Sequence, residues 1–102
     1  MIRSFKCRAT RDLFAGKPVP RFANIRTVAE RKLAMVHRAA CLEDLRIPPN
    51  NRLEALRGER KGQCSIRIND QWRICFRFDN DGASEVEIVD YHRPRQEEAI
   101  HE

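Results

Sequence analysis

The chain has 102 residues, of which 41% are hydrophobic and 34% charged, with a formal net charge of +5. A chain of this length is about one domain and can bury a core without metal or disulfide support. It holds no stretch close to the roughly 18 apolar residues of a membrane span, and its first residues lack the apolar run of a signal peptide. We therefore expect a cytoplasmic protein with no membrane partner.

The charge is unevenly distributed along the chain. Residues 1–24 hold six Lys or Arg and one acid, Asp12, whereas residues 95–102 hold one Arg and three Glu. A basic surface favours polyanions or an acidic protein partner, and charge alone does not choose between them.

The cysteines do not follow a ligand or redox pattern. Cys7, Cys41, Cys64 and Cys75 include no CxxC pair, the spacing typical of zinc sites and redox motifs. We expect free thiols, no metal and no cofactor.

The first twenty residues predict a short strand and a short helix. Ile2 and Phe5 alternate loosely with polar residues, as in a strand. Thr10–Ala15 is followed by Gly16, a frequent helix terminator, and so predicts a helix. The prolines of Lys17–Pro20 predict a connector, because proline does not fit a helix interior.

One long apolar pattern runs from Phe22 to about Leu45 and predicts a single amphipathic helix packed on a sheet. Lys32 lies at the border of the apolar stripe, where its stem can cover apolar surface while its charge stays in water. His37 lies among charged residues on the opposite side and is interpreted as a solvated surface residue. The stripe consists of Ile25, Val28, Ala29, Leu33, Val36, Ala39, Ala40 and Leu42.

Three later runs alternate with the two-residue period of strands, at Gln63–Asn69, Trp72–Phe78 and Glu85–His92. The polar breaks Asn69–Gln71 and Asp79–Gly82 are rich in turn residues, so the runs predict an antiparallel meander. Together with the earlier elements, this order predicts an α+β domain in which two N-terminal helices pack on one side of an antiparallel sheet of three to four strands.

Cationic residues are expected to gather on the outer face of this sheet, opposite the apolar side chains. Such a surface suits the binding of a phosphodiester backbone. The turn before the first run contributes Arg57, Arg60 and Lys61, and the strands contribute Arg67, Arg73 and Arg77.

The last run ends in Asp90, Tyr91 and His92, beside this basic face. The ordinary pKa of a histidine, about 6.5, makes His92 a candidate general acid or base. Asp90 shares its strand face and can orient the imidazole or act as the base, whereas Tyr91 points the other way in a regular strand. With Arg57 and Arg73 as phosphate clamps, the set suits metal-free RNA cleavage by the 2′-hydroxyl. The structural alternative is a packing tyrosine, a surface imidazole and a solvated arginine face.

Three segments resemble the HigB toxins of the RelE/ParE superfamily: Ile2–Phe5, Pro48–Phe78 and Val86–His92. The most specific features are L-x-G-x-R-x-G-x-x-S-I, N-x-x-W-R-I and the D-Y-H ending. The resemblance covers residues 1–92 as a single RelE-like toxin domain and leaves residues 93–102 as a C-terminal tail.

The resemblance implies a type II toxin–antitoxin system. Its toxin would be a metal-free, ribosome-dependent endonuclease, or mRNA interferase, that contacts 16S rRNA and cleaves mRNA in the ribosomal A site. Its partner would be a HigA-type antitoxin with a helix-turn-helix, through which the pair binds operator DNA.

The resemblance also implies roles for individual residues. Asp90, Tyr91 and His92 match the catalytic cluster, and Arg73 matches an arginine that contacts substrate phosphate. Arg57 stands where some members carry a catalytic lysine, so it keeps the charge without a titratable amine. Glu54 stands where some carry a histidine, and a carboxylate there would weaken or redirect RNA binding.

Two alternatives stay open at this point. One is a non-enzymatic gyrase inhibitor of the ParE kind, which shares the fold but would not need the titratable cluster. The other is a weakly active toxin retained for antitoxin binding and operon autoregulation, an alternative motivated by Glu54 and Arg57.

Overall fold

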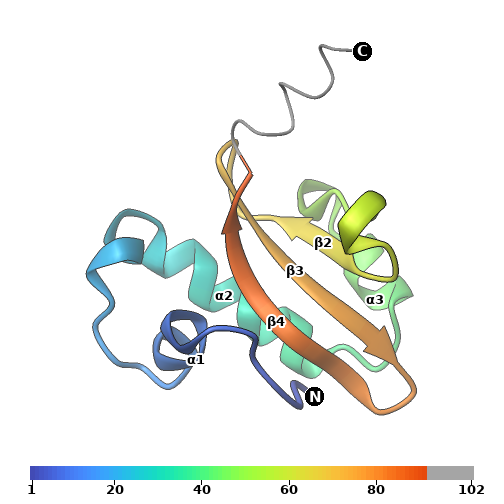
Figure 1. The fold of residues 1–102 in the computed structure, drawn as a ribbon, viewed down its shortest axis with the longest axis horizontal. Helices are drawn as coiled ribbons and strands as arrows, with labels where there is room; N and C mark the ends of the chain where they lie inside the picture. The colour runs from blue at the N-terminus through green and yellow to red at the C-terminus, as the bar shows by residue number, and fades with distance from the viewer. Residues whose placement is uncertain (92–102) are drawn as a thin grey trace.

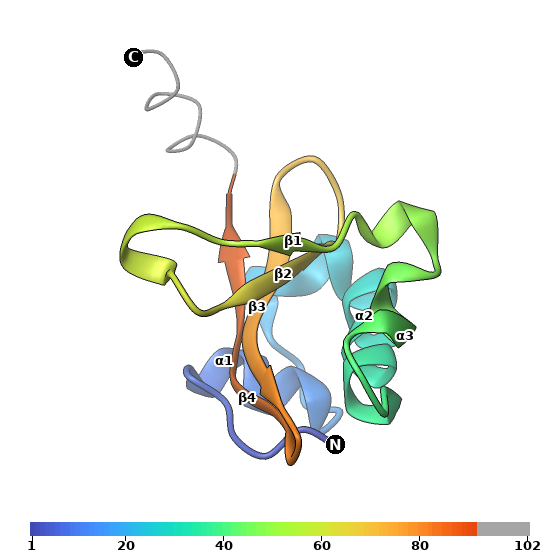
Figure 2. The ribbon, with the colours of Figure 1, turned by 90° about the vertical axis from the view of Figure 1, so that its right-hand side faces the viewer.

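A computed structural model of the chain describes residues 1–91, and residues 92–102 lie outside the described part. Helices α2 and α3 gather on one side of an antiparallel sheet, whose other face we call the outer face (Figures 1 and 2). The sheet has the strand order β1-β2-β3-β4. The elements are α1 (Arg8–Phe14), η1 (Pro20–Ile25), α2 (Arg26–Arg38), α3 (Glu43–Arg46), η2 (Pro49–Asn51), β1 (Glu54–Ala55), η3 (Gly58–Arg60), β2 (Cys64–Arg67), β3 (Trp72–Asp79) and β4 (Gly82–Asp90), the η elements being 3-10 helices.

The predicted α+β class and the β2-β3-β4 meander are confirmed, but the fourth strand is not the predicted one. It is β1, whose Glu54 pairs with Ser65 of β2. The N-terminal segment instead runs parallel to β4 and makes isolated bridges from Ile2 to Ala83 and from Phe5 to Val86. It therefore extends the sheet beside β4 without forming a full strand.

The single long helix predicted from Phe22 to Leu45 is wrong. The segment divides into η1, α2 and α3, and the backbone becomes extended at Ala39 (φ −64°, ψ 128°). The Asp44 carboxylate accepts hydrogen bonds from the backbone N–H groups of Ala40 (2.8 Å) and Cys41 (3.3 Å). A side chain that bonds nearby backbone groups in this way competes with helical hydrogen bonds, and the helix ends before it.

The core lies between the helices and one face of the sheet. Phe22 of η1 packs edge-on against Trp72 of β3, with 5.6 Å between the ring centroids. Full burial of an aliphatic or aromatic side chain contributes roughly 1.5–3 kcal/mol, so this layer is the main source of stability. Its buried members include Ile25, Ala29, Leu33 and Val36 from the helical side and Ile66, Ile74, Phe76, Val86 and Ile88 from the sheet.

A β-bulge in β4 sets which side chains reach the outer face. Glu85 and Val86 together lie opposite Phe76, and Glu85 has a positive φ of 54°. Beyond the bulge the register pairs Cys75 with Glu87 and continues to the end of β4. Alternate residues of β4 thus share the outer face with those of β3.

None of the helices in the described part of the chain has the length and apolar character that a bilayer crossing requires.

Candidate functional site

Part of the outer face is as deeply buried as the core. Ser65 and Cys75, which pair across β2 and β3, have no exposed surface, and Arg73 is 9% exposed. The segment around η3 contributes to this cover, because Arg60 reaches across to Glu87 of β4, with 3.5 Å between Nη1 and Oε1. Figure 2 shows the segment around η3 on the side of the sheet away from α2 and α3. The outer face is therefore partly enclosed.

Arg73 is held in one orientation inside this enclosure. Its Nε donates to the Ser65 hydroxyl (2.7 Å), and its Nη2 donates to the Arg52 carbonyl (2.6 Å). Burial lowers the pKa of the guanidinium, and the Glu54 carboxylate, 3.9 Å from Nη2, acts against that change. An arginine keeps its charge under these conditions, so the site holds a fixed cation.

The Arg52 carbonyl is itself positioned by a buried polar pair. Arg52 follows η2 with a left-handed backbone (φ 44°), directly after the fully buried Asn51. The Asn51 amide donates to the Leu45 carbonyl (3.1 Å), and its oxygen accepts from the Lys32 ammonium (2.6 Å). This pair ties η2 to α2 and α3, and thereby fixes the place of the acceptor that Arg73 uses.

The prediction that the charge of Lys32 stays in water is wrong. The side chain is 5% exposed, and burial is the main cause of its lowered pKa. Lys32 follows Ala29 by three residues and precedes Val36 by four, so its position on the apolar stripe was a signal of burial. The sequence did not reveal its acceptor, Asn51.

Tyr91, and not Asp90, lies beside Arg73. The Arg73 Cζ is 5.9 Å from the centroid of the Tyr91 ring, within the range of a cation–π interaction. Asp90 pairs with Trp72 on the other face of the sheet and accepts from the Gln71 amide (3.1 Å). Asp90 and Tyr91 therefore point to opposite sides, as regular strand alternation predicts. His92 lies outside the described residues.

The prediction that a row of arginines projects from the outer face is wrong for Arg73. Arg73 is buried, while Arg67 and Arg77 are paired with Asp70 and Glu85. Arg73 turns to acceptors inside the fold, the Ser65 hydroxyl and the Arg52 carbonyl, whereas the hairpin turn and β4 bring carboxylates beside Arg67 and Arg77. The surface around the site is consequently mixed in charge.

The remaining predicted binding residues lie in the segment that covers the sheet. Arg57 directly precedes η3, Lys61 directly follows it, and both are exposed. Within residues 1–91 neither of them forms an ion pair, whereas Arg60 is bonded to Gln63 (3.1 Å) and Glu87. Arg57 and Lys61 are therefore cations available to an anionic ligand.

The cysteines of the site region are unsuited to nucleophilic chemistry. All four cysteines are free thiols, and burial raises the pKa of Cys75 to about 11. A thiolate is the reactive form, so Cys75 is a packing residue at neutral pH. In the part of the chain that the structure describes, no three His, Cys, Asp or Glu side chains group as metal ligands do.

The chain has a small RelE-like fold. Two short helices and the longer α2 come first, and a four-stranded antiparallel sheet follows, with a buried arginine near its last strand. The family model described as "RelE-like toxin of type II toxin-antitoxin system HigB" matches residues 19–92. The chain is 42% identical over 71 residues to Toxin HigB-1 of Vibrio cholerae serotype O1. The matched residues cover 70% of this chain and 74% of that protein. An uncharacterised protein of Haemophilus influenzae is 37% identical over 59 residues, or 58% of each chain.

The chain belongs to the HigB-like toxins of type II toxin–antitoxin systems. The resemblance inferred from its motifs is confirmed, and membership implies an antitoxin as partner.

Proposed function

We propose that this toxin is a ribosome-dependent mRNA endonuclease that cleaves by means of the RNA 2′-hydroxyl and is neutralised by a HigA-type antitoxin. In this proposal the toxin works in the cytoplasm, contacts 16S rRNA, and reaches operator DNA only through the antitoxin. Support comes from membership of a toxin family whose members generally cleave mRNA, and from the site at the end of β4.

The observation that carries the proposal is the anchored guanidinium of Arg73 beside Tyr91. Cleavage by the 2′-hydroxyl adds negative charge at phosphorus, and a cation fixed before the reaction stabilises that charge without reorganisation. Nε and Nη2 are already bonded to Ser65 and Arg52, whereas Nη1 has no hydrogen-bond partner within residues 1–91. Nη1 is the donor we assign to the phosphate.

Proton transfer requires other groups, because arginine does not give up its proton. We assign the general acid or base to His92, whose ordinary pKa lies near neutrality. Tyr91 supplies a hydroxyl on the Arg73 side, and Asp90 acts from the opposite side of the strand. Arg57 adds positive charge but no titratable amine.

The rim of the site would hold the RNA strand. Lys61 is unpaired within the described chain, and Arg60, Arg67 and Arg77 form partly or fully exposed ion pairs. Such pairs contribute only about 0–1 kcal/mol each, so a phosphate can replace the carboxylate at little cost.

The test is cleavage of a defined message on purified ribosomes, read by mapping 5′ ends. We expect His92→Gln to slow cleavage by about 10²- to 10⁴-fold, the usual contribution of a positioned acid or base. Arg73→Met should slow it by about 10²- to 10³-fold through loss of a fixed donor. Arg38→Gln, an exposed change on α2, is the control and should cleave at the wild-type rate.

Both site variants should still bind the antitoxin with unchanged affinity, which separates a lost reaction from a lost fold. Cleavage at the wild-type rate in both variants would remove these residues from the reaction. DNA damage without any transcript cleavage would favour the gyrase-inhibitor alternative instead.

One observation favours a weakly active toxin as second candidate. The Glu54 carboxylate lies 3.9 Å from Arg73 Nη2, where it competes with an RNA phosphate for the cation. Harmless expression of the free chain, together with a tight antitoxin complex, would support this candidate.

A further inference from the structure

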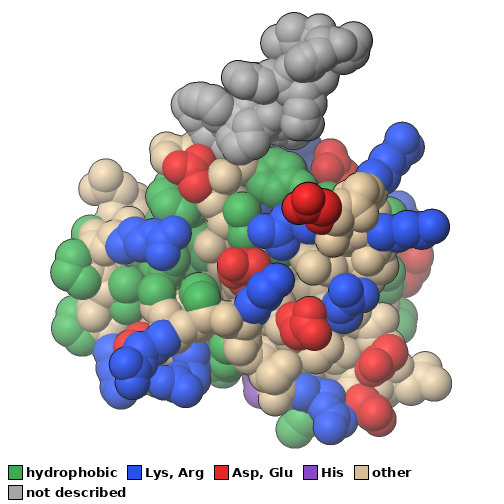
Figure 3. Space-filling view, in the orientation of Figure 1, with side chains coloured by type: hydrophobic (Ala, Val, Ile, Leu, Met, Phe, Trp, Pro, Cys, Tyr) green, Lys and Arg blue, Asp and Glu red, His purple; other side chains and the backbone are tan. Residues whose placement is uncertain are grey.

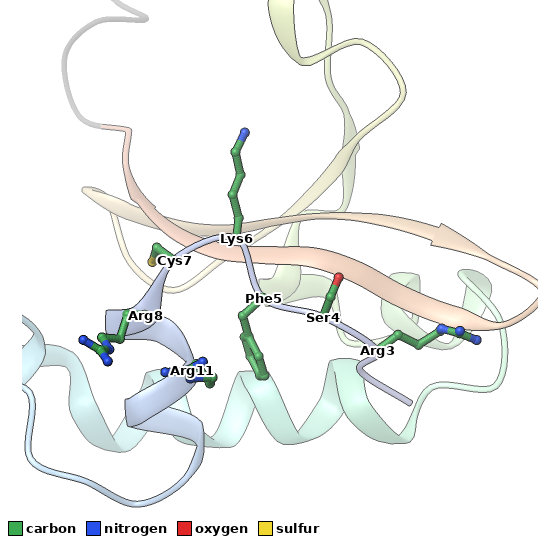
Figure 4. A pocket seen from close by; sticks show the side chains of 7 residues that line it. All are labelled: Arg3, Ser4, Phe5, Lys6, Cys7, Arg8 and Arg11. Carbon is green, nitrogen blue, oxygen red and sulfur yellow. The ribbon is translucent and has the colours of Figure 1, made fainter.

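Four cations line a shallow pocket at the N-terminal end of the molecule, away from the residues assigned to the reaction. We call them the basic edge: Arg3, Lys6, Arg8 and Arg11. The pocket has a volume of about 680 Å³ and is formed by the segment that runs beside β4 and by α1 (Figure 4). Its remaining lining residues are Ser4, Phe5 and Cys7.

The charges of the basic edge are poorly neutralised. Arg3 and Arg11 make only long contacts with Asp81 (3.6 Å) and Asp12 (3.9 Å). Within residues 1–91, Lys6 and Arg8 belong to no ion pair. Arg8 and Arg11 are three residues apart on α1, so their side chains are neighbours on the helix surface and their like charges repel each other. Such a cluster costs stability unless an anion binds it.

The basic edge is connected to the outer face of the sheet through Lys6. In Figure 4 the Lys6 side chain points away from α2, opposite to Phe5. The positive charge of Lys6 lowers the pKa of the Cys75 thiol, as do the charges of Arg60 and Arg73, although burial raises it overall. Lys6 therefore lies near the part of the outer face around Cys75. In the space-filling view, Lys and Arg side chains gather around α1 (Figure 3).

Two of these cations, Arg8 and Arg11, lie close enough together to contact neighbouring phosphates of a nucleic acid strand. Arg3 and Lys6 are three residues apart on an extended segment, a rise of about 10 Å. Arg8 and Arg11 lie about 5–6 Å apart at Cβ. Arg3 and Lys6 add positive charge on other sides of the same segment (Figure 4), and three of the four cations are arginines, whose planar donors suit phosphate oxygens.

An acidic protein partner fits this surface less well. Protein interfaces have an apolar centre that anchors the partner. The one large apolar residue in the pocket, Phe5, is already packed on the core and against Phe14, with 5.6 Å between ring centroids. The pocket therefore offers charge without an apolar anchor.

We propose that the basic edge binds the sugar–phosphate backbone of RNA outside the codon that is cut, as an extension of the site on the outer face. The identity of the ligand as RNA rests on the proposed function. The basic edge would add affinity and salt dependence, and would take no part in proton transfer.

The test measures binding of the full-length toxin to 70S ribosomes programmed with a message whose A-site codon carries 2′-deoxyribose, so that binding occurs without cleavage. The double variant Arg8→Gln/Arg11→Gln is compared with Arg31→Gln/Arg38→Gln, which removes the same charge from exposed positions of α2. Each lost phosphate contact should lower the slope of log affinity against log salt by about 0.7–0.9.

We expect Arg8→Gln/Arg11→Gln to bind programmed ribosomes more weakly than wild type at 50 mM salt. Its slope of log affinity against log salt should be lower by roughly 1.4–1.8. The ratio of wild-type to variant affinity should therefore fall roughly ten-fold between 50 and 200 mM salt. The control variant should keep the wild-type slope. Circular dichroism and thermal unfolding should show that both variants are folded.

An unchanged slope in Arg8→Gln/Arg11→Gln, or an equal fall in both variants, would overturn the proposal. Weaker antitoxin binding with unchanged ribosome binding would assign the surface to the protein partner. Cleavage of an all-ribose message by the wild-type toxin is measured separately. If the wild-type toxin does not cleave this message, the proposed nuclease function is rejected. The difference in salt slope between the two double variants would still show whether the basic edge binds RNA.

Discussion

The two faces of the sheet bury their side chains by different means. On the helix side, Ile74 and Phe76 are buried among other apolar groups, and exclusion of water stabilises them. On the outer face, Ser65 and Arg73 are buried with hydrogen bonds to each other and to backbone carbonyls. The first kind of burial stabilises the fold, whereas the second fixes the position of a charge.

The difference follows from the cost of removing polar groups from water. An apolar side chain can shift slightly in its layer and lose little, but a buried donor without an acceptor costs about 1–3 kcal/mol. The hydrogen bonds of the Arg73 guanidinium therefore restrict it to a narrow range of positions. The same rule applies to Lys32 and Asn51, which hold the Arg52 carbonyl in place. Polar burial on the outer face thus fixes the position of the Arg73 guanidinium.

The largest effect on stability is expected on the helix side. Phe76→Ala should lower the free energy of unfolding by about 3–5 kcal/mol, because it removes a fully buried ring and leaves a cavity. Urea unfolding followed by circular dichroism measures the change. Phe14→Ala, at an exposed ring on α1, is the control and should cost much less. Equal losses in the two variants would contradict a stability that resides in the buried layer.

An intermediate, pH-dependent effect is expected from Cys75 on the outer face. Its pKa is raised by burial from 9.0 to about 11, so the folded state holds the proton that the unfolded state releases. The resulting stability is complete below pH 9 and is lost as the pH rises to about 11, a change of roughly 2–3 kcal/mol.

Urea unfolding at a series of pH values tests this expectation. Cys75→Ala lacks the titrating thiol. Between pH 9 and 11 the free energy of unfolding of wild type should therefore fall by roughly 2–3 kcal/mol more than that of Cys75→Ala. Cys41→Ala, at an exposed cysteine, should follow the wild-type pH dependence. Parallel curves for wild type and Cys75→Ala would show that this part of the outer face is open to water.

The smallest effect is expected from Glu54, the exposed partner of Arg73. Glu54→Gln should change stability by less than about 1 kcal/mol, because the carboxylate is exposed to water and lies 3.9 Å from the guanidinium, which keeps its other hydrogen bonds. It should raise affinity for programmed ribosomes a few-fold, since a carboxylate no longer competes with phosphate for the guanidinium. Glu43→Gln, in an exposed pair with Arg46, is the matched control. Weaker ribosome binding by Glu54→Gln would show that the carboxylate supports RNA binding.

Local patterns in the sequence predicted the meander well, because strand alternation and turn residues depend on near neighbours. The same kind of pattern failed between Phe22 and Leu45, where apolar spacing continued through a break. The break at Ala39 depends on the Asp44 side chain, which the period of apolar residues does not register. Apolar periodicity therefore identified the buried residues of this segment better than its helix boundaries.

The sequence by itself determined the α+β class, the membership of the HigB-like toxins, and the residues available at the end of β4. Only the tertiary structure decided that Arg73 is enclosed, that Tyr91 is its neighbour, and that β1 completes the sheet. The physical reason is distance along the chain: Arg73 bonds Arg52 across 21 positions, and Lys32 bonds Asn51 across 19. Hydrophobic patterns are written into adjacent residues, but the partners of buried polar groups are chosen by how the folded elements meet.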